Sequence, residues 1–379
     1  MTAFESLLTA WPDRRSRLPD LLDGRTGVVL VGAGKVGREF LAALQASHVP
    51  VLAFTDNDAG KWGQVVAGVP VIAPDEAVRR FGPRGVFLVT IGRVGTGAAQ
   101  VVQQFTSLGA DRVLHFIEAI PLVPSIWRHF FLAPDVFGAG DRERCAEAYA
   151  LFQDQRSKDL FTAHLRWRTT LDASALPIPD YDNQYFPPDV IAPRHCASFV
   201  DVGAYTGDTL SALTAFAGGS LRTYHGFEPD PRNYETLLAE ARALTERHPA
   251  VRVVTRCVAI GAAHQQLSFA GDGSATSQVS ASGSDRVECV PLDSVEMERP
   301  TYLKIDVEGA EDDVLTGGTR TLRQWKPTVA IATYHRPKDL FDLPLRLAGH
   351  APDYRFHLRS HGDAGIDLVC YAVREPAAS

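Results

Sequence analysis

The sequence predicts an α/β protein of two units, each a mostly parallel sheet with helices on both faces. Twice along the chain, an apolar run typical of a buried strand ends in a glycine-containing turn that opens a helix, at Gly32 to Gly37 and at Asp201 to Gly207. After each turn a second apolar run ends in an acid, first Asp56 and later Glu228. This order is typical of Rossmann-like nucleotide folds.

Length and charge support two soluble units. The chain has 379 residues, more than one hydrophobic core usually serves. Its net charge of −7 argues against nucleic acid or an anionic membrane as a partner. The scattered cysteines, the absence of an apolar leader and the lack of a membrane-length apolar run predict a cytoplasmic protein. Whether the chain forms a homo-oligomer is left open by the sequence.

The first unit, predicted over residues 1–118, alternates strands and helices. A helix is expected from Leu7 to Leu22, before the first strand. The segments that follow alternate strand and helix, as Val28–Val31, Lys35–Ser47, Val51–Thr55, then Val86–Ile91, Ala98–Leu108 and Val113–Ile117.

Three interpretations of this unit stay open. Gly32, Gly34 and Gly37 form a complete G-x-G-x-x-G turn, and Asp56 lies 24 positions after Gly32, where a ribose-binding acid is expected. The unit could bind a nucleotide or nucleotide-sugar, serve only in packing or dimerisation, or bind NAD(P). It also resembles nucleotide-binding-like domains that precede sugar-modifying acyltransferases.

Residues 119–195 are predicted to connect the units. Helices are expected over 142–151 and 158–168, followed by a segment dense in proline and aromatic residues over 176–189. Tyr185 and Phe186 in that segment are predicted to form a lid that lines a pocket for the substrate; a plain linker is the alternative.

The last unit is predicted over residues 196–379. Its third strand is expected at Val251–Ile260 and its fifth at Thr328–Thr333, with an antiparallel pair, Tyr354–Leu358 and Ile366–Val373, at the edge. A hairpin is expected from 265–270 and 286–291. The acids Asp201, Glu228 and Asp306 then fall at the carboxyl ends of strands, where ligands bind in such sheets.

The turn after the first strand of this unit favours a cationic cofactor. Asp201 stands where a dinucleotide loop has its first glycine, and a carboxylate there would repel a pyrophosphate. S-adenosylmethionine carries a sulfonium and an ammonium group, which a carboxylate attracts. The turn therefore favours S-adenosylmethionine over NAD.

Four motifs resemble those of the FkbM-type methyltransferases. They are Phe-Val-Asp-Val-Gly-Ala-x-x-Gly-Asp-Thr at 199–209, Phe-Glu-Pro at 227–229, Val-Pro-Leu-Asp-Ser at 290–294 and Lys-Ile-Asp-Val-Glu-Gly-Ala-Glu at 304–311. The resemblance covers roughly residues 180 to 375. It implies a class I methyltransferase fold with a mixed seven-stranded sheet, S-adenosylmethionine as donor, and methylation of a hydroxyl oxygen on a saccharide or natural product.

The resemblance and the strand-end positions together predict the site. Donor contacts are expected from a set of loop and strand-end residues: Asp201, Gly203, Ala204, Tyr205, Gly207, Asp208, Thr209, Glu228, Pro229, Ala259, Ser277 and Asp306. Tyr205 replaces an asparagine common in the family, so its contact is in doubt. His335 is either the base for the acceptor proton or a residue that holds its loop.

Asp306 could orient the acceptor, take its proton or hold the donor ammonium. Glu308 and Glu311 could share Mg²⁺ with Asp306; alternatively, Glu311 is only an acid at a helix N-terminus. Lys304 is expected to point away or to pair with an acid. The leading prediction is an O-methyltransferase. The alternatives are a non-catalytic nucleotide-sugar-binding or partner protein and an NAD(P)-linked oxidoreductase.

Overall fold

The structure is a computed structural model. It describes residues 2–9, 22, 24–91, 98–116, 138–170, 176–270, 278–279 and 285–374. By compactness the chain divides into unit 1 (1–137, 162–181 and 362–366) and unit 2 (138–161, 182–361 and 367–379). The boundaries expected at 118 and 195 stay a prediction; in this division residues 138–161 belong with the C-terminal sheet.

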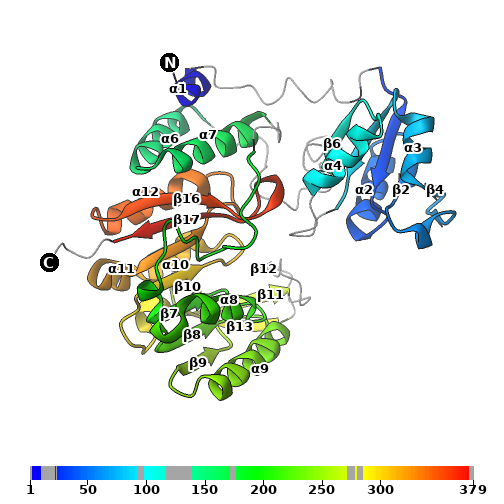
Figure 1. Cartoon of the computed structure of the whole chain (residues 1–379). Coiled ribbons are helices and arrows are strands. Elements are labelled where there is room, and N and C mark those ends of the chain that lie inside the picture. Colours follow the sequence, from blue (N-terminus) through cyan, green and yellow to red (C-terminus); the bar gives the residue numbers. More distant parts are fainter. Residues whose placement is uncertain are drawn as a thin grey trace. The chain divides into compact units, whose positions relative to one another are not determined.

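Unit 1 contains a six-stranded sheet in the order β3-β4-β2-β1-β5-β6 (Figure 1). Only the β3–β4 pair is antiparallel. The strands are β1 (Gly27–Val31), β2 (Val51–Thr55), β3 (Val65–Val66), β4 (Val69–Ile72), β5 (Gly85–Val89) and β6 (Val113–His115), and the helices are α1 (Ala3–Thr9), α2 (Lys35–Ala46), α3 (Pro74–Phe81) and α4 (Ala98–Ser107).

Alternation along β1 gives this sheet two apolar faces. Val28 and Leu30 pack in one cluster with Phe40 of α2, whereas Val29 and Val31 pack in another with residues of α3 and α4. Successive side chains on a strand point to opposite faces, so helices cover both sides. The strands and helices predicted from Val28 to Ser107 are confirmed, with ends shifted by a residue or two.

The N-terminal helix differs from the prediction. It covers Ala3–Thr9 rather than starting at Leu7, and residues 10–21 and 23 lie outside the described part of the chain. The end of the predicted strand at Ile117 also lies outside it. Helices α6 (Ala139–Leu151) and α7 (Gln155–Thr170) confirm the two helices expected in the connector.

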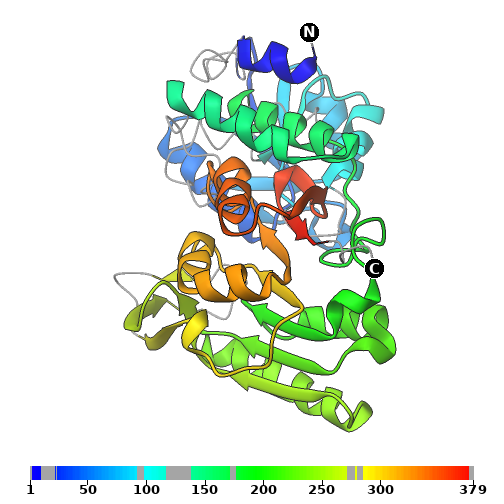
Figure 2. The same cartoon turned by 90° about the vertical axis from the view of Figure 1, so that its left-hand side faces the viewer.

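Unit 2 contains a seven-stranded sheet in the order β16-β17-β15-β14-β7-β8-β9. The strands are β7 (Ser198–Val202), β8 (Thr223–Phe227), β9 (Arg252–Arg256), β14 (Tyr302–Ile305), β15 (Thr328–Ala332), β16 (Arg355–Ser360) and β17 (Leu368–Val373). The first five are parallel and β17 is antiparallel to both neighbours, which confirms the mixed sheet. Figure 2 shows β7 to β9 with helix α9 beside β9.

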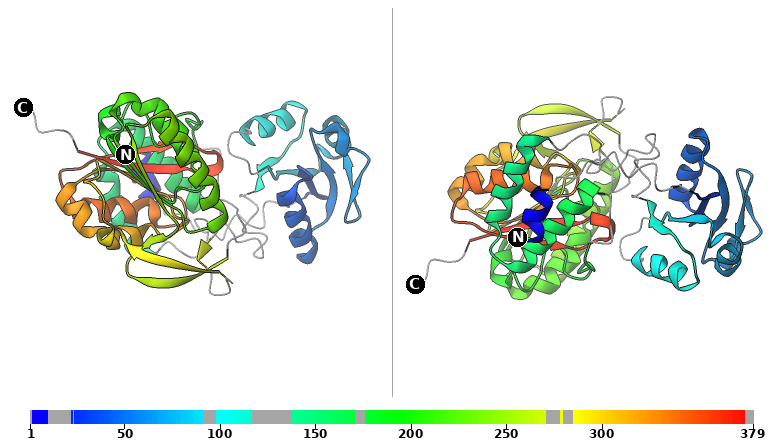
Figure 3. Two further views of the ribbon diagram at one scale, coloured as in Figure 1. Left: turned by 90° about the horizontal axis from the view of Figure 1, so that it is seen from below. Right: turned by 90° about the horizontal axis from the view of Figure 1, so that it is seen from above.

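The order of strands reverses between β7 and β14. The chain winds from β7 outward to β9, then returns to β14 and winds the other way. Right-handed crossovers therefore place the two sets of helices on opposite faces, as Figure 3 shows. The sets are α8 (Asp208–Ala217) and α9 (Pro231–Arg247), against α10 (Glu311–Gly317), α11 (Thr319–Trp325) and α12 (Asp339–His350). Ligands of such sheets bind at this reversal, beyond the carboxyl ends of β7 and β14.

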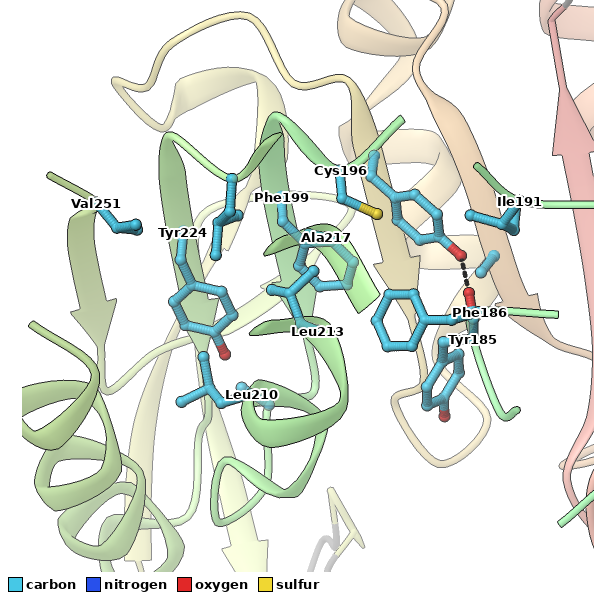
Figure 4. Close-up of a cluster of buried hydrophobic side chains, with 14 of the residues drawn as sticks. Tyr185, Phe186, Ile191, Cys196, Phe199, Leu210, Leu213, Ala217, Tyr224 and Val251 are labelled. Carbon is cyan, nitrogen blue, oxygen red and sulfur yellow. Dashed lines mark hydrogen bonds between the residues drawn. The ribbon is translucent and has the colours of Figure 1, made fainter. Parts of the chain in front are cut away.

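An aromatic core fixes the centre of this sheet. Phe199 of β7 stacks on Tyr302 of β14, with ring centroids 4.8 Å apart, and on Tyr224 of β8 at 6.2 Å. Leu210 and Leu213 of α8 belong to the same cluster (Figure 4). Stacked rings bury much apolar area in a defined geometry, so they hold the three central strands in register.

The bounds predicted for one strand are wrong. The run Val251–Ile260 is not one strand: β9 ends at Arg256, and β10 (Ala259–Gly261) joins a separate four-stranded sheet in the order β10-β13-β11-β12. The hairpin of β11 (Gln265–Ala270) and β13 (Asp285–Pro291) is confirmed; β12 is Gln278–Val279. Among the described residues, none of the helices combines the length and the hydropathy that a bilayer span needs.

We predict that Gly37→Ala destabilises unit 1. A Cβ at Gly37 would lie 2.0 Å from the backbone oxygen of Gly32, too close for any contact, so the loop or the helix must move. The expected loss is about 1–3 kcal/mol of unfolding free energy. Differential scanning calorimetry of the full chain measures it.

Gly34→Ala in the same turn is the matched control. A Cβ there meets nothing within 4 Å, so the unfolding temperature is expected to stay within about one degree of wild type. Equal stability of the two variants would contradict the close packing of α2 on the turn.

Candidate functional site

A buried ion pair lies beneath the turn after β7. Lys304 Nζ of β14 lies 2.8 Å from Asp201 Oδ1 and donates to the carbonyl oxygen of Gly203 at 2.8 Å. The Tyr224 hydroxyl donates to the other carboxylate oxygen of Asp201 at 3.0 Å. Both charged side chains are almost wholly buried. The second alternative for Lys304, pairing with an acid, is therefore correct.

Burial raises the pKa of Asp201 and the Lys304 ammonium group opposes that rise, so each partner favours the charged form of the other. Burial alone lowers the pKa of Lys304, but the carboxylates of Asp201, Asp306 and Asp208 outweigh it and raise this pKa. Because both oxygens of Asp201 are occupied inside the protein, its effect on a ligand passes through the turn that Lys304 holds. Its direct contact with a cofactor stays a prediction.

Gly203 brings this turn against the end of β14. Its φ is +83°, and a Cβ there would lie 1.8 Å from the carbonyl oxygen of Asp306. Only glycine fits this close approach in the left-handed region. The turn after β7 and the end of β14 therefore form one surface.

Glu228 holds the other side of the turn. Its carboxylate accepts the backbone N–H of Tyr205 at 2.9 Å and of Asp230 at 2.9 Å. Burial is the main cause that raises its pKa, ahead of these two bonds, which lower it. Tyr205 has a φ of +47°, rare for a bulky residue. Such strained residues persist where the surroundings fix them, often at functional sites.

His335 follows β15 and is oriented by Glu311. His335 Nδ1 lies 2.8 Å from Glu311 Oε1, which also accepts the backbone N–H groups of Val307 at 3.0 Å and Gly309 at 3.3 Å. Burial alone lowers the pKa of His335, but the carboxylates of Glu311 and Glu308 raise it well above its usual value. Glu311 is thus both the acid at the start of α10 and the partner of His335.

The free nitrogen of His335 faces two carboxylates. Its Nε2 lies 3.5 Å from Asp306 Oδ1 and 3.6 Å from Glu308 Oε2. Asp306 Oδ2 accepts the hydroxyl of Tyr185 at 2.6 Å. Tyr185 and Glu308 have φ values of +68° and +54°, so strain gathers here as well.

Most predicted donor residues lie along the turn and the strand ends. Ala204 and Thr209 are buried, whereas Asp208 is exposed at the start of α8, after Gly207 with a φ of +85°. Pro229 follows Glu228 directly, and Ala259 begins β10. Ser277 lies outside the described residues. Donor contacts by all of these stay predictions.

Of the two predicted lid residues, only Tyr185 reaches the site. Phe186 packs in the core against Phe199 and Tyr302, with ring centroids 5.9 and 6.1 Å apart. Figure 4 shows Tyr185 and Phe186 within this cluster. Both are nearly buried, so the segment is built into the sheet's core rather than lying over it as a separate cover.

The glycine turn of unit 1 is formed, and Asp56 lies beside it. The Asp56 carboxylate accepts the backbone N–H of Ala33 at 2.9 Å and of Asp58 at 2.9 Å, and pairs with Lys61 Nζ at 2.9 Å. A ribose hydroxyl would have to share these oxygens with Lys61. Nucleotide binding by Gly32, Gly34, Gly37 and Asp56 stays a prediction.

Three site residues were not found from the sequence. Tyr224 binds Asp201, and Tyr334 and Asp367 lie behind His335, hydrogen-bonded to each other. Burial, with a further contribution from Asp306, raises the pKa of Asp367 to about 6. Asp367 lies just before the apolar run of the last strand, and nothing in the sequence around it distinguishes it from an exposed acid.

Comparisons with known proteins match the C-terminal part of the chain to a domain family and the chain to a known fold. Residues 201–363 match the model of the methyltransferase FkbM domain, which confirms the resemblance. The structure of methyltransferase FkbM from Methylobacillus flagellatus KT is similar over 98% of this chain and 97% of that chain, with a TM-score of 0.74 and 23% identity. At that identity the likeness shows the fold.

Other solved structures match only in part. A putative rRNA-methylase from Clostridium thermocellum aligns with 49% of this chain and 90% of its own, at 11% identity and a TM-score of 0.31. The precorrin-6y C5,15-methyltransferase from Geobacter metallireducens GS-15 aligns with 47% and 80%, at 12% identity and 0.30. A search of curated proteins finds no match.

We predict that Lys304→Met destabilises unit 2 by about 3–5 kcal/mol, because it leaves the buried Asp201 carboxylate without its cation. Chemical denaturation followed by circular dichroism measures the loss. The double variant Asp201→Asn/Lys304→Met removes both charges and should be clearly more stable than Lys304→Met. If the two were equally unstable, the charge pair would not be the cause.

A second prediction concerns pH. The pKa of Asp367 is about 6 in the folded protein and near 3.8 in the unfolded chain. The folded protein therefore keeps this carboxyl group protonated up to a higher pH than the unfolded chain does. The contribution of Asp367 to stability should therefore fall as pH rises from about 4 to 6, by about 3 kcal/mol in the limit.

Asp367→Asn should remove that fall and be more stable than wild type at pH 7, though not at pH 4. Denaturation at both pH values checks it. A variant that lost stability equally at both would show that the charge of Asp367 has no part.

Proposed function

We propose that the methyltransferase FkbM domain of this chain transfers a methyl group from S-adenosylmethionine to a hydroxyl of a saccharide or natural product. The observation that carries the proposal is a row of acids beyond the carboxyl ends of three neighbouring strands, at and beside the reversal of the sheet. Asp208, Glu228 and Asp306 follow the ends of β7, β8 and β14. A sulfonium donor with an ammonium group suits such a site, whereas a pyrophosphate does not.

Glu228 is proposed to bind the donor's ribose. Its carboxylate stands at the end of β8, and two backbone N–H groups fix its orientation. Each oxygen keeps a further lone pair for a hydroxyl donor. Because one of the two N–H groups belongs to Tyr205, the same acid also holds the strained turn in place.

Asp201 is proposed to act through Lys304. The ammonium group of Lys304 binds the carbonyl oxygen of Gly203 and so fixes the turn that would surround the donor's methionine end. Well-oriented reactants gain up to about 7–11 kcal/mol from proximity. The gain depends on a turn that does not move, which is what the buried pair supplies.

The acceptor is proposed to bind between β14 and β15. Asp306 is one-fifth exposed and Glu308 one-quarter, so solvent reaches both beside the buried His335. A hydroxyl must lose its proton when its oxygen receives the methyl group. The carboxylates of Asp306 and Glu308 and the Nε2 atom of His335 converge where that hydroxyl would lie, and either carboxylate could accept its proton. Unit 1 is proposed to bind a nucleotide-linked sugar.

We predict that Glu228→Gln weakens binding of S-adenosylhomocysteine by about 10- to 100-fold, because hydrogen bonds to a charged group contribute about 1.5–3 kcal/mol. Calorimetric titration of the full chain measures the affinity. Glu235→Gln, an exposed acid on the following helix, is the matched control and should bind like wild type.

Two results would oppose the proposal. Wild-type affinity in Glu228→Gln would remove the ribose assignment. Binding of NADH but not of S-adenosylhomocysteine by the wild-type chain would remove the methyl donor itself. Transfer of a radiolabelled methyl group to hydroxylated sugars then tests the reaction.

A further inference from the structure

We propose that Asp306, Glu308 and His335 bind a divalent transition-metal ion. One oxygen of each carboxylate and the imidazole Nε2 lie within 4.8 Å of one another. They come from the loop after β14 and the loop after β15, next to each other in the sheet. Three donor atoms thus converge on one point from two loops.

Their separations fit metal ligands better than hydrogen bonds. Nε2 lies 3.5 Å from Asp306 Oδ1 and 3.6 Å from Glu308 Oε2, beyond normal hydrogen-bond length. Around a cation with bonds of about 2.1 Å, ligand atoms at tetrahedral angles lie about 3.4 Å apart. The two separations from Nε2 need little movement to reach that value, and the two carboxylate oxygens lie within 4.8 Å of each other.

Buried atoms at this point lack hydrogen-bond partners. Asp306 Oδ1 and His335 Nε2 are both enclosed, and apart from their 3.5 Å separation from each other neither has a hydrogen-bond partner; the His335 side chain is only 6% exposed. An enclosed polar atom without a partner is costly and needs an explanation. A cation between these atoms would satisfy both.

The surrounding bonds orient the ligands for this purpose. Glu311 binds His335 at Nδ1 and so fixes the ring with Nε2 toward the two carboxylates, where a metal ion would take the place of a proton. The Tyr185 hydroxyl occupies the other oxygen of Asp306. In metal centres, a ligating histidine commonly donates its second ring N–H to a carboxylate, and a ligating carboxylate is itself held by a hydrogen bond.

The ligand types favour some ions over others. An imidazole nitrogen is a good ligand for Zn²⁺, Fe²⁺ or Mn²⁺, and carboxylate oxygens are good ligands for Mn²⁺. Mg²⁺ prefers oxygen ligands only. The site differs in this from the all-carboxylate Mg²⁺ site expected from the sequence. Glu311 is not part of the three-residue cluster, and its Oε1 accepts from two backbone N–H groups and contacts His335 Nδ1, so its role here is to orient His335.

Binding of the ion does not depend on the proposed function, whereas its role in preparing an acceptor for methylation rests on that function. A hydroxyl oxygen bound to a divalent cation releases its proton to water more readily, so the ion would prepare an acceptor for methylation. In that state His335 is a ligand rather than the base.

Titration of the metal-free full chain with MnCl₂ alone, without donor or acceptor, tests the site. Electron paramagnetic resonance of free Mn²⁺ should show one ion bound per chain, and an equal concentration of MgCl₂ should not displace it. His335→Gln should weaken binding at least tenfold, and so should Glu308→Gln, whose partly exposed side chain carries little risk to folding.

Asp313→Asn removes an exposed acid on α10 outside the cluster and should bind Mn²⁺ like wild type. Absence of Mn²⁺ binding by the wild-type chain, or unchanged binding in Glu308→Gln, would overturn the site. Loss of metal binding with S-adenosylhomocysteine binding retained would leave the methyltransferase proposal intact, so the two can fail separately.

Discussion

The buried pair of Asp201 and Lys304 is the constraint on which the site depends. Removing two charges from water costs several kcal/mol each, and only close, fully bonded geometry offsets that cost. Here Lys304 bonds to Asp201 and to the carbonyl oxygen of Gly203, and Tyr224 completes Asp201. One interaction therefore ties three parallel strands and the turn above them. A small shift of β14 against β7 would break it, so the strand register and the shape of the turn are set together.

That constraint extends to the second half of the site. Gly203 lies against the carbonyl oxygen of Asp306, so a turn held by Lys304 also holds the end of β14. From Asp306 the contacts continue to Tyr185 and toward His335. Tyr185 and Glu308 adopt positive φ values within these contacts, and Tyr205 does so in the turn that Glu228 holds. The strain is located where side chains must point inward from neighbouring loops, and the buried pair gives those loops a rigid base.

The sequence predicts local patterns well and distant partners poorly. The glycine turns, the acids at the strand ends and the antiparallel edge strand follow from patterns within a single strand and the turn or strand next to it in the chain, and the structure confirms the elements that carry them. The bond from Glu311 to His335 spans 24 residues and a change of strand, and that from Tyr185 to Asp306 spans 121. No periodicity encodes such pairs, because they depend on which strands become neighbours. The break of the run 251–260 was missed for the same reason, since β10 leaves β9 to pair with β13.

The two units hold their glycine turns in the same way but differ in the charge around the acid that does so. In each, an acid at the end of the second strand accepts the N–H of the glycine turn and the N–H two residues after itself, Asp56 in unit 1 and Glu228 in unit 2. This acid first serves the fold, because it holds the turn whether or not a ligand binds. The Asp56 carboxylate also pairs with the ammonium group of Lys61, which neutralises its charge. Among the described contacts, the Glu228 carboxylate has hydrogen bonds from backbone N–H groups alone. A shared backbone arrangement therefore does not imply a shared ligand, and a cationic donor is expected to prefer the end of β8 to the end of β2.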